Sequence, residues 1–245
     1  MTRPPALLSL AVCAALVAPG VASSITIDTP FCTVRKSPPL VGIYEISRAA
    51  VDERLLDLRV HSDAMQGTQP VYVLLPTNYD PSGATRYPVL YLLHGALDDY
   101  TSWPVHGVDD VVGDRQMIVV MPDDLRLGSY ADWYGMVAGV PGPIPSLETY
   151  HTAELIPFID AAFPTVADPS GRFVAGLSSG GSGTYKYSAA HPGLFGAAGG
   201  FSAAVHITID HPFYPTINEA LWTPSLIPGY GPPGFCTFGD PYTQQ

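Results

Sequence analysis

The sequence predicts an α/β fold with a mostly parallel sheet flanked by helices. The main indication is a series of short apolar runs without alternation, which is typical of strands buried on both faces. Between them, two segments are predicted to be helices. Segment 147–162 has apolar residues at helical spacing, and segment 179–191 has small, polar residues on one side. Strands that alternate with helices indicate a parallel sheet. The apolar runs cover residues 71–76, 89–93, 117–121, 172–176 and 195–201.

The composition indicates one packed domain. The chain has 245 residues, of which 47% are hydrophobic and 13% charged, so disorder is not expected. We find no internal repeat and no linker, and we expect residues 25–245 to form a single domain. Segments 25–27 and 55–60 are expected to add early antiparallel strands.

The first 24 residues have the pattern of a secretory signal peptide. Arg3 supplies a positive charge, residues 6–17 are apolar, and Ala22 begins a run of small residues that suits signal peptidase. The apolar run is shorter than the roughly 20 residues that a membrane span needs. We therefore expect a secreted or extracytoplasmic protein with no stable membrane insertion after cleavage. The alternative is an uncleaved N-terminal anchor.

Charge and cysteine content exclude several classes of partner. The formal net charge is −11, which argues against nucleic acid and against anionic lipid surfaces. After signal cleavage Cys32 and Cys236 remain, and an oxidising compartment would permit a disulfide between them, although the sequence leaves their pairing open. Two distant cysteines make no zinc site. We expect neither a metal nor an organic cofactor, and we interpret Asp98-Asp99 and Asp123-Asp124 as turns or cleft contacts.

The pentapeptide Gly176-Leu177-Ser178-Ser179-Gly180 follows a predicted strand and precedes a predicted helix. This is the context of a nucleophile elbow, in which the serine lies on a sharp strand-to-helix turn. Ser178 is therefore the predicted nucleophile, and the backbone N–H of Ser179 is a predicted oxyanion donor at the helix N-terminus. The alternatives are a glycine-rich turn capped by Ser178, or Ser179 as the nucleophile.

A second oxyanion donor is expected from the loop after an earlier strand. The run 89–93 ends at His94-Gly95-Ala96, where parallel sheets bind their ligands, and we assign this donor to the N–H of Ala96. His94 precedes the serine, which is the wrong order for the catalytic base of this architecture. We interpret it as a structural histidine that supports the loop.

Between about residues 71 and 203 the chain resembles the esterase family that contains secreted bacterial serine esterases and the mycobacterial mycolyltransferases of the antigen 85 complex. The resemblance implies an α/β-hydrolase fold, a Ser-His-acid triad and acyl-ester chemistry, and it supports Ala96 and Ser179 as the oxyanion pair. Those transferases carry Asp-Gly in place of His94-Gly95 and Met-Ala in place of Ser179-Gly180, so the departures favour a general esterase. The strings that carry the resemblance are Tyr91-Leu92-Leu93-His94-Gly95, Asp98-Asp99-Tyr100 with Trp103, Val119-Val120-Met121-Pro122, Ser129-Tyr130-Ala131-Asp132-Trp133-Tyr134, Glu148-Thr149-Tyr150 with Glu154-Leu155, and Gly176-Leu177-Ser178.

The triad partners of Ser178 are not evident. In α/β-hydrolases the acid and the histidine follow the serine, and in the resembling family both lie beyond a position equivalent to about residue 240. His191 is expected to end a helix, while His206 and His211 are candidate bases that are more readily interpreted as loop residues lining the cleft. We therefore expect a chain truncated at its C-terminus, without the last strands of the fold.

The leading prediction is a secreted serine esterase that hydrolyses carboxylic esters through an acyl-Ser178 intermediate. One alternative is an acyltransferase that moves the acyl group to a sugar hydroxyl, and another is a binding protein or fragment without activity. The expected partner is a small-molecule or glycolipid ester. The sequence does not identify the substrate.

Overall fold

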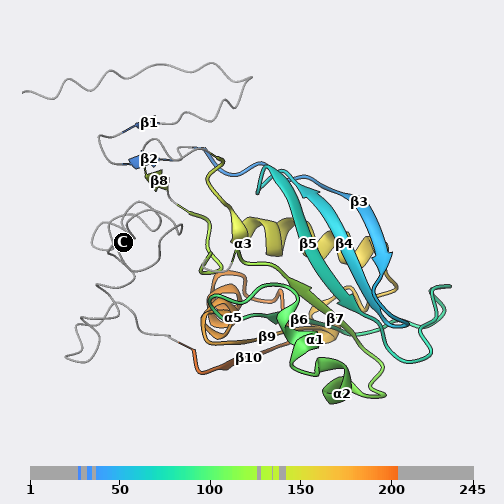
Figure 1. Cartoon of the computed structure of the whole chain (residues 1–245). Helices are drawn as coiled ribbons and strands as arrows, with labels where there is room; N and C mark the ends of the chain where they lie inside the picture. Colours follow the sequence, from blue (N-terminus) through green and yellow to red (C-terminus); the bar gives the residue numbers. More distant parts are fainter. Residues whose placement is uncertain are drawn as a thin grey trace, which may run out of the picture.

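A computed structural model describes residues 27–28, 32–34, 37–125, 128–133, 135–137 and 142–203. Its centre is a seven-stranded sheet with the strand order β10-β9-β6-β7-β5-β4-β3 (Figure 1). The strands are β3 (Ile43–Ala50), β4 (Leu55–Ser62), β5 (Gly67–Leu74), β6 (Val89–Leu93), β7 (Ile118–Pro122), β9 (Arg172–Leu177) and β10 (Ala197–Phe201). The apolar runs of the sequence therefore correspond to strands, as predicted.

The described part of this sheet is mixed rather than mostly parallel. The four strands β10, β9, β6 and β7 pair in parallel, whereas β7–β5, β5–β4 and β4–β3 are antiparallel. Short connections over residues 51–54 and 63–66 join β3, β4 and β5, and such hairpins can only make antiparallel pairs. The antiparallel strand expected at 55–60 is β4.

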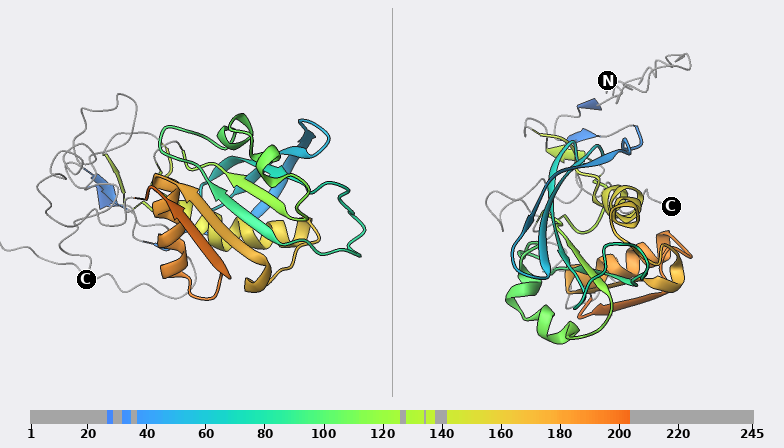
Figure 2. Two further views of the ribbon diagram at one scale, coloured as in Figure 1. Left: turned by 90° about the horizontal axis from the view of Figure 1, so that it is seen from below. Right: turned by 90° about the vertical axis from the view of Figure 1, so that its right-hand side faces the viewer.

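Helices cover both faces of the sheet (Figure 2). One face carries α1 (Ser102–Val105) and α2 (Val108–Val112). The other face carries α5 (Ser179–Ala190) and a continuous helical segment made of α3 (Leu147–Thr149), η1 (Tyr150–Leu155) and α4 (Ile156–Ala162). A short 3₁₀ turn, η2 (Pro169–Gly171), precedes β9.

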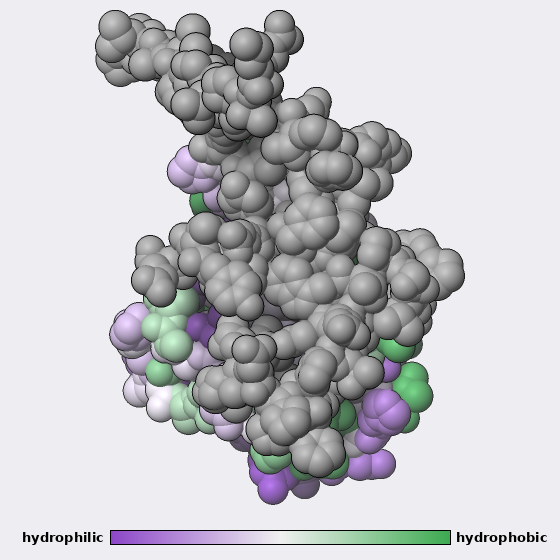
Figure 3. Space-filling view, turned by 90° about the vertical axis from the view of Figure 1, so that its left-hand side faces the viewer, coloured by the Kyte–Doolittle hydropathy of each residue, from purple (hydrophilic) through white to green (hydrophobic). Residues whose placement is uncertain are grey.

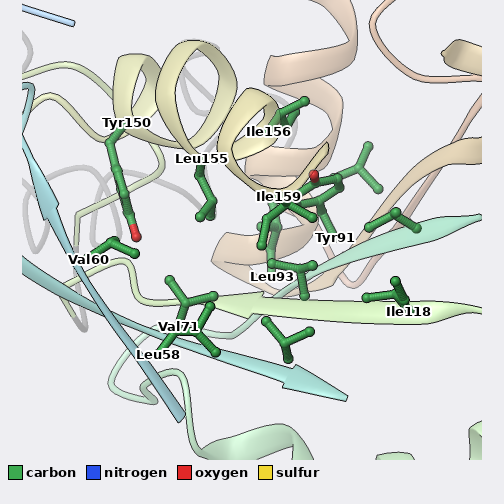
Figure 4. Close-up of a cluster of buried hydrophobic side chains, with 14 of the residues drawn as sticks. Leu58, Val60, Val71, Tyr91, Leu93, Ile118, Tyr150, Leu155, Ile156 and Ile159 are labelled. Atoms are coloured by element: carbon green, nitrogen blue, oxygen red, sulfur yellow. The ribbon is translucent and has the colours of Figure 1, made fainter. Parts of the chain in front are cut away.

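Two hydrophobic clusters hold these layers together. Along β6, Tyr91 and Leu93 belong to the larger cluster with the segment 147–162, and Leu92 belongs to the smaller cluster with α2. Strand β7 alternates in the same way, and all five of its residues are buried. Figure 4 shows the helical segment lying against strands of the sheet through Leu155, Ile156 and Ile159. Burial on both faces explains why these strands lack polar alternation.

The helix predicted for 147–162 is confirmed, and it contains a π-helical turn. In η1, five of the six residues are buried: Tyr150, His151, Thr152, Glu154 and Leu155. A π-helical turn spaces side chains more widely than an α-helix does, and such turns are frequent at functional sites. The turn lets this helix bury a wide face that includes three polar side chains.

Strands β1 (Ile27–Asp28), β2 (Cys32–Val34) and β8 (Gly135–Val137) form a separate three-stranded sheet. The strand expected at 25–27 overlaps β1 at Ile27, and residues 25 and 26 lie outside the described residues. On the face shown in Figure 3 the described residues mix hydrophilic and hydrophobic side chains. Among the described residues, no helix is long and apolar enough to span a membrane.

Candidate active site

Ser178 lies at the turn between β9 and α5, at the carboxyl end of the parallel strands. Its backbone has φ 56° and ψ −116°, a combination that is unfavourable for a residue with a side chain. The residue is exposed, and its N–H donates to the carbonyl oxygen of Phe201 at 2.8 Å. A strained, exposed serine between a strand and a helix has the geometry of a nucleophile elbow.

The helix after Ser178 approaches the sheet closely because Gly180 has no side chain. A Cβ atom added to Gly180 would lie 2.3 Å from the carbonyl oxygen of Leu93 and 2.6 Å from that of His94. Those oxygens belong to the end of β6 and to the loop that follows it. Gly180 therefore sets the distance between the predicted nucleophile and the predicted oxyanion loop.

The structure brings the loop after β6 next to Ser178. A Cβ atom added to Gly95 would lie 3.7 Å from the Cβ of Ser178. Ala96 is exposed and follows Gly95 directly, and Ser179 is the first residue of α5. The two predicted oxyanion donors thus flank Ser178 from two different elements.

His94 is buried below this loop and is held through both ring nitrogens. Its Nε2 accepts from the backbone N–H of Asp124 at 2.9 Å, and its Nδ1 lies 2.8 Å from the carbonyl oxygen of Gly95. The ring is 1% exposed. These contacts agree with the interpretation of His94 as support for the loop.

A buried polar network under the site was not anticipated from the sequence. The Tyr130 hydroxyl donates to the carbonyl oxygen of His94 at 2.8 Å, and the Tyr130 N–H donates to Asp124 Oδ1 at 2.9 Å. His151 links the Tyr187 hydroxyl, 2.7 Å from Nδ1, to the carbonyl oxygen of Asp123, 3.1 Å from Nε2. Tyr130 belongs to the string 129–134, whose role the sequence did not reveal.

Burial controls the charge of this network. Burial lowers the pKa of His151 to about 3, so the ring is neutral near pH 7. Burial also raises the pKa of Asp124 well above its ordinary value, although the backbone N–H groups that donate to this carboxylate lower the pKa in part. The pKa of Tyr130 and that of Tyr187 are likewise raised well above their ordinary values by burial, so both phenols remain protonated donors.

The candidate bases are not brought to Ser178 within the described part of the chain. His206 and His211 lie outside the described residues, as does Cys236. His191 follows the last residue of α5, as expected, and its Nε2 lies 3.0 Å from Glu148 Oε1. It borders a surface hollow at the opposite end of α5 from Ser178.

The acidic pairs that the sequence suggested as turns make turn contacts. Asp99 Oδ1 accepts from the N–H and the hydroxyl of Thr101, at 2.9 and 2.6 Å. Asp123 Oδ2 accepts from the N–H of Leu125 at 3.0 Å. Within the described ranges, no three histidine, cysteine or acidic side chains are grouped as metal ligands.

A mixed sheet, helices on both faces and a strained serine at the carboxyl end of a parallel strand define the α/β-hydrolase class. The chain belongs to the Esterase family, whose model matches residues 62–235.

Two curated relatives agree with this family. Esterase Rv1288 of Mycobacterium tuberculosis strain H37Rv is 39% identical over 172 residues, which cover 69% of this chain and 36% of that protein. The diacylglycerol acyltransferase/mycolyltransferase Ag85A of Mycobacterium gordonae is 35% identical over 126 residues, covering 50% of this chain and 37% of the transferase. The chain thus matches little more than a third of the length of these relatives.

Solved structures support the same fold. A ferulic acid esterase is 28% identical with a TM-score of 0.52, covering 61% of this chain and 57% of its own. The fluorophosphonate-binding serine hydrolase FphF of Staphylococcus aureus is 20% identical with a TM-score of 0.59, covering 76% of this chain and 66% of its own. At this low identity, the similarity to FphF supports only the fold.

Proposed function

We propose that this protein is a secreted serine esterase that hydrolyses carboxylic esters through an acyl-Ser178 intermediate. The observation that carries the proposal is the strained backbone of Ser178 beside the loop of Gly95 and Ala96. The relatives named esterase support the ester chemistry. A small-molecule ester is the proposed substrate, and a glycolipid ester is the alternative.

In the proposed reaction, Ser178 Oγ bonds to the acyl carbon while its proton passes to a base. The carbonyl oxygen becomes an oxyanion, which the N–H groups of Ala96 and Ser179 stabilise. The carbon–oxygen bond to the alcohol breaks, and the alcohol leaves with the proton. Water then attacks the acyl-Ser178 ester, which releases the acid and restores the serine.

The base is proposed to be a histidine that follows Ser178 in the chain, because triads of this fold run serine, acid, histidine. His206 and His211 are the candidates to test. If one of them is the base, its replacement by alanine should lower kcat by about 10⁴-fold. Replacement of the other histidine should leave kcat nearly unchanged.

A matched pair of variants tests the nucleophile. Ser178→Ala is expected to abolish labelling by a fluorophosphonate probe and to lower the hydrolysis of p-nitrophenyl acetate by about 10⁴-fold or more. Ser179→Ala keeps the backbone N–H and removes only the neighbouring hydroxyl, so it should still be labelled. Labelling lost in Ser179→Ala alone would transfer the role to that residue. A folded wild-type protein without labelling would favour a binding role.

Acyl transfer to a sugar hydroxyl is a second candidate, because one relative is named a mycolyltransferase. Transfer and hydrolysis share the acyl-Ser178 intermediate and differ in the acceptor. Adding trehalose to the ester assay distinguishes them. Acyl-trehalose formed at the expense of free acid would favour transfer, and an unchanged yield of free acid would favour hydrolysis.

Secretion is proposed from the apolar segment 6–17 and the small residues that follow it. Expression of the full chain in an exporting host, followed by N-terminal sequencing of the exported protein, tests this. Cleavage near residue 24 is expected. A protein that stays membrane-bound with an intact N-terminus would favour the anchor.

A further inference from the structure

The two peptide units on either side of Gly95 are both held by hydrogen bonds. The carbonyl oxygen of His94 accepts from the Tyr130 hydroxyl at 2.8 Å. The carbonyl oxygen of Gly95 lies 2.8 Å from Nδ1 of His94 and also accepts a hydrogen bond from the N–H of Asp98 at 3.2 Å. The backbone of this loop is therefore constrained immediately before Ala96.

The direction of the Gly95 carbonyl determines the direction of the Ala96 N–H. Both groups belong to one peptide unit, and no described peptide bond is cis. In a planar trans peptide the C=O and the N–H point in opposite directions. A contact that holds the Gly95 oxygen on the buried side consequently turns the Ala96 N–H away from that side.

The surroundings of His94 dictate which of its nitrogens donates. The backbone N–H of Asp124 can only donate, and it lies 2.9 Å from Nε2, so Nε2 is the acceptor. A neutral ring that accepts at Nε2 carries its proton on Nδ1. Nδ1–H therefore donates to the Gly95 carbonyl oxygen, and the backbone of Asp124 maintains this tautomer.

Tyr130 is itself held from three sides. Its N–H donates to Asp124 Oδ1, and its carbonyl oxygen accepts from Lys186 Nζ on α5 at 3.0 Å. Its ring lies against Gly183 of α5, where an added Cβ would be 2.5 Å from Tyr130 Cγ. Tyr130 also has φ 52°, which is unfavourable for an aromatic residue. The phenol is fully buried and ties the helix that begins after Ser178 to the loop before Ala96.

We propose that His94 and Tyr130 are positioning residues that together aim the Ala96 N–H at the oxyanion formed during ester cleavage. This inference rests on the proposed function, because Ala96 and Ser178 are its oxyanion donor and nucleophile. It gives a role to Tyr130, which the proposed reaction does not otherwise use. A histidine that only filled space would not need its Nδ1 proton directed at Gly95.

Two substitutions of His94 separate its contacts. His94→Asn keeps an amide N–H near the position of Nδ1 but loses the acceptor at Nε2. His94→Gln can keep an acceptor for Asp124 but loses the donor near Gly95. The loss of one oxyanion donor costs about 10²–10³ in kcat, and a misdirected donor should cost part of that. We expect kcat to fall by about 30-fold or more in His94→Gln and by about 5-fold in His94→Asn, with KM within about 3-fold of the wild-type value in both.

Tyr130→Phe removes only the hydroxyl and keeps the ring packing. We expect kcat to fall by about 10-fold, again with KM little changed. Tyr79→Phe is a matched control, because that tyrosine lies in the connection between β5 and β6 and its loss of a hydroxyl should leave both constants unchanged. The proposal would be overturned if His94→Asn and His94→Gln lost kcat equally, in proportion to the fall in their melting temperatures. Values of kcat and KM in Tyr130→Phe equal to those of the wild type would also overturn it.

A measurement without turnover separates this inference from the proposed function. Wild-type protein that neither hydrolyses esters nor is labelled at Ser178 would refute the proposed function. The ¹H–¹⁵N chemical shifts of the Ala96 amide, which depend on the orientation of its peptide unit, can still be followed in that protein. We expect them to move further from the wild-type values in His94→Gln than in His94→Asn. Equal shifts in the two variants would contradict the positioning role.

Discussion

The two halves of the main sheet differ in what they contribute to the site. The parallel half, β6, β7, β9 and β10, carries Ser178 and the Gly95 loop at its carboxyl ends. The antiparallel half, β3, β4 and β5, supplies residues of β4 and β5 to both hydrophobic clusters and ends in β3, where seven of eight residues are exposed. In the parallel half the backbones of β9, α5 and β6 approach one another closely at Gly176 and Gly180, so the two halves should differ in their tolerance of substitution at these contacts.

The largest expected difference concerns glycine. Gly180→Ala would place a Cβ 2.3 Å from the Leu93 oxygen, so α5 would have to move away from β6. We expect a loss of about 3 kcal/mol or more in the free energy of unfolding, together with loss of Ser178 labelling. Gly67→Ala in β5 is the control, because its Cβ would meet only the Met65 oxygen at 3.9 Å. Equal stability of the two variants in urea unfolding would refute the distinction.

Within the antiparallel half, core and edge strands should also differ. Leu58 on β4 is 0% exposed, and Leu58→Ala is expected to cost about 3 kcal/mol through the cavity that it leaves. Ile46 on β3 is 51% exposed, and Ile46→Ala should change stability by about 0.5 kcal/mol or less. Urea unfolding of both variants checks this. A large cost in Ile46→Ala would mean that another surface covers β3.

Glu154 of the π-helical turn connects the helical segment to the antiparallel half. Its Oε1 accepts from the N–H groups of Gly42 at 2.8 Å and of Ala64 at 2.9 Å, and its other oxygen accepts from the Ser62 hydroxyl. Glu154→Gln places an NH₂ group among these donors and should cost about 2 kcal/mol. The exposed Glu53→Gln is the control, with an expected change of about 0.5 kcal/mol or less in the same unfolding assay.

His151, which lies in η1 and contacts the Asp123 carbonyl just after β7 and Tyr187 on α5, should make the stability of the protein depend on pH. Its folded pKa of about 3 lies below the ordinary 6.5, so the unfolded chain takes up this proton first as the pH falls. The stability contributed by neutral His151 is present above about pH 6.5 and is lost toward pH 3, by about 2 kcal/mol at pH 5. Asp124, whose pKa is raised, acts in the opposite sense.

The difference in unfolding free energy between the wild type and His151→Gln separates the contribution of His151 from those of other titrating groups. The stability advantage of the wild type over His151→Gln should shrink by about 2 kcal/mol between pH 7.5 and pH 5, because the contribution of Asp124 is common to both. Urea unfolding at several pH values measures it. An advantage that does not change with pH would show that His151 is protonated as readily in the folded protein as in the unfolded chain.

The same contrast explains how much could be predicted from the sequence. Strands β6, β7 and β9 are buried on both faces, and their apolar runs located them to within a residue or two. Strand β3 was missed, because an exposed edge strand needs no apolar pattern. The sharp turn at Ser178 could be predicted because a strand-to-helix elbow depends on local spacing; the role of Ser178 as nucleophile stays a prediction. The contact of Tyr130 with His94 joins residues 36 positions apart, and no local pattern encodes it.

The π-helical turn accommodates one extra residue in the helix of residues 147–162. The exposed Ala153 lies within this turn, between the buried Thr152 and Glu154. Deleting that one alanine would convert the wide turn into an α-helical turn, and the residues after it would keep their phase, so Ile156 and Ile159 would still face the core. A deletion at the exposed Pro157, in the regular turns of α4, would instead rotate the residues after it by about 100° and turn Ile159 away from the core. The wide turn is therefore a place where the length of this helix can change by one residue without loss of its packing.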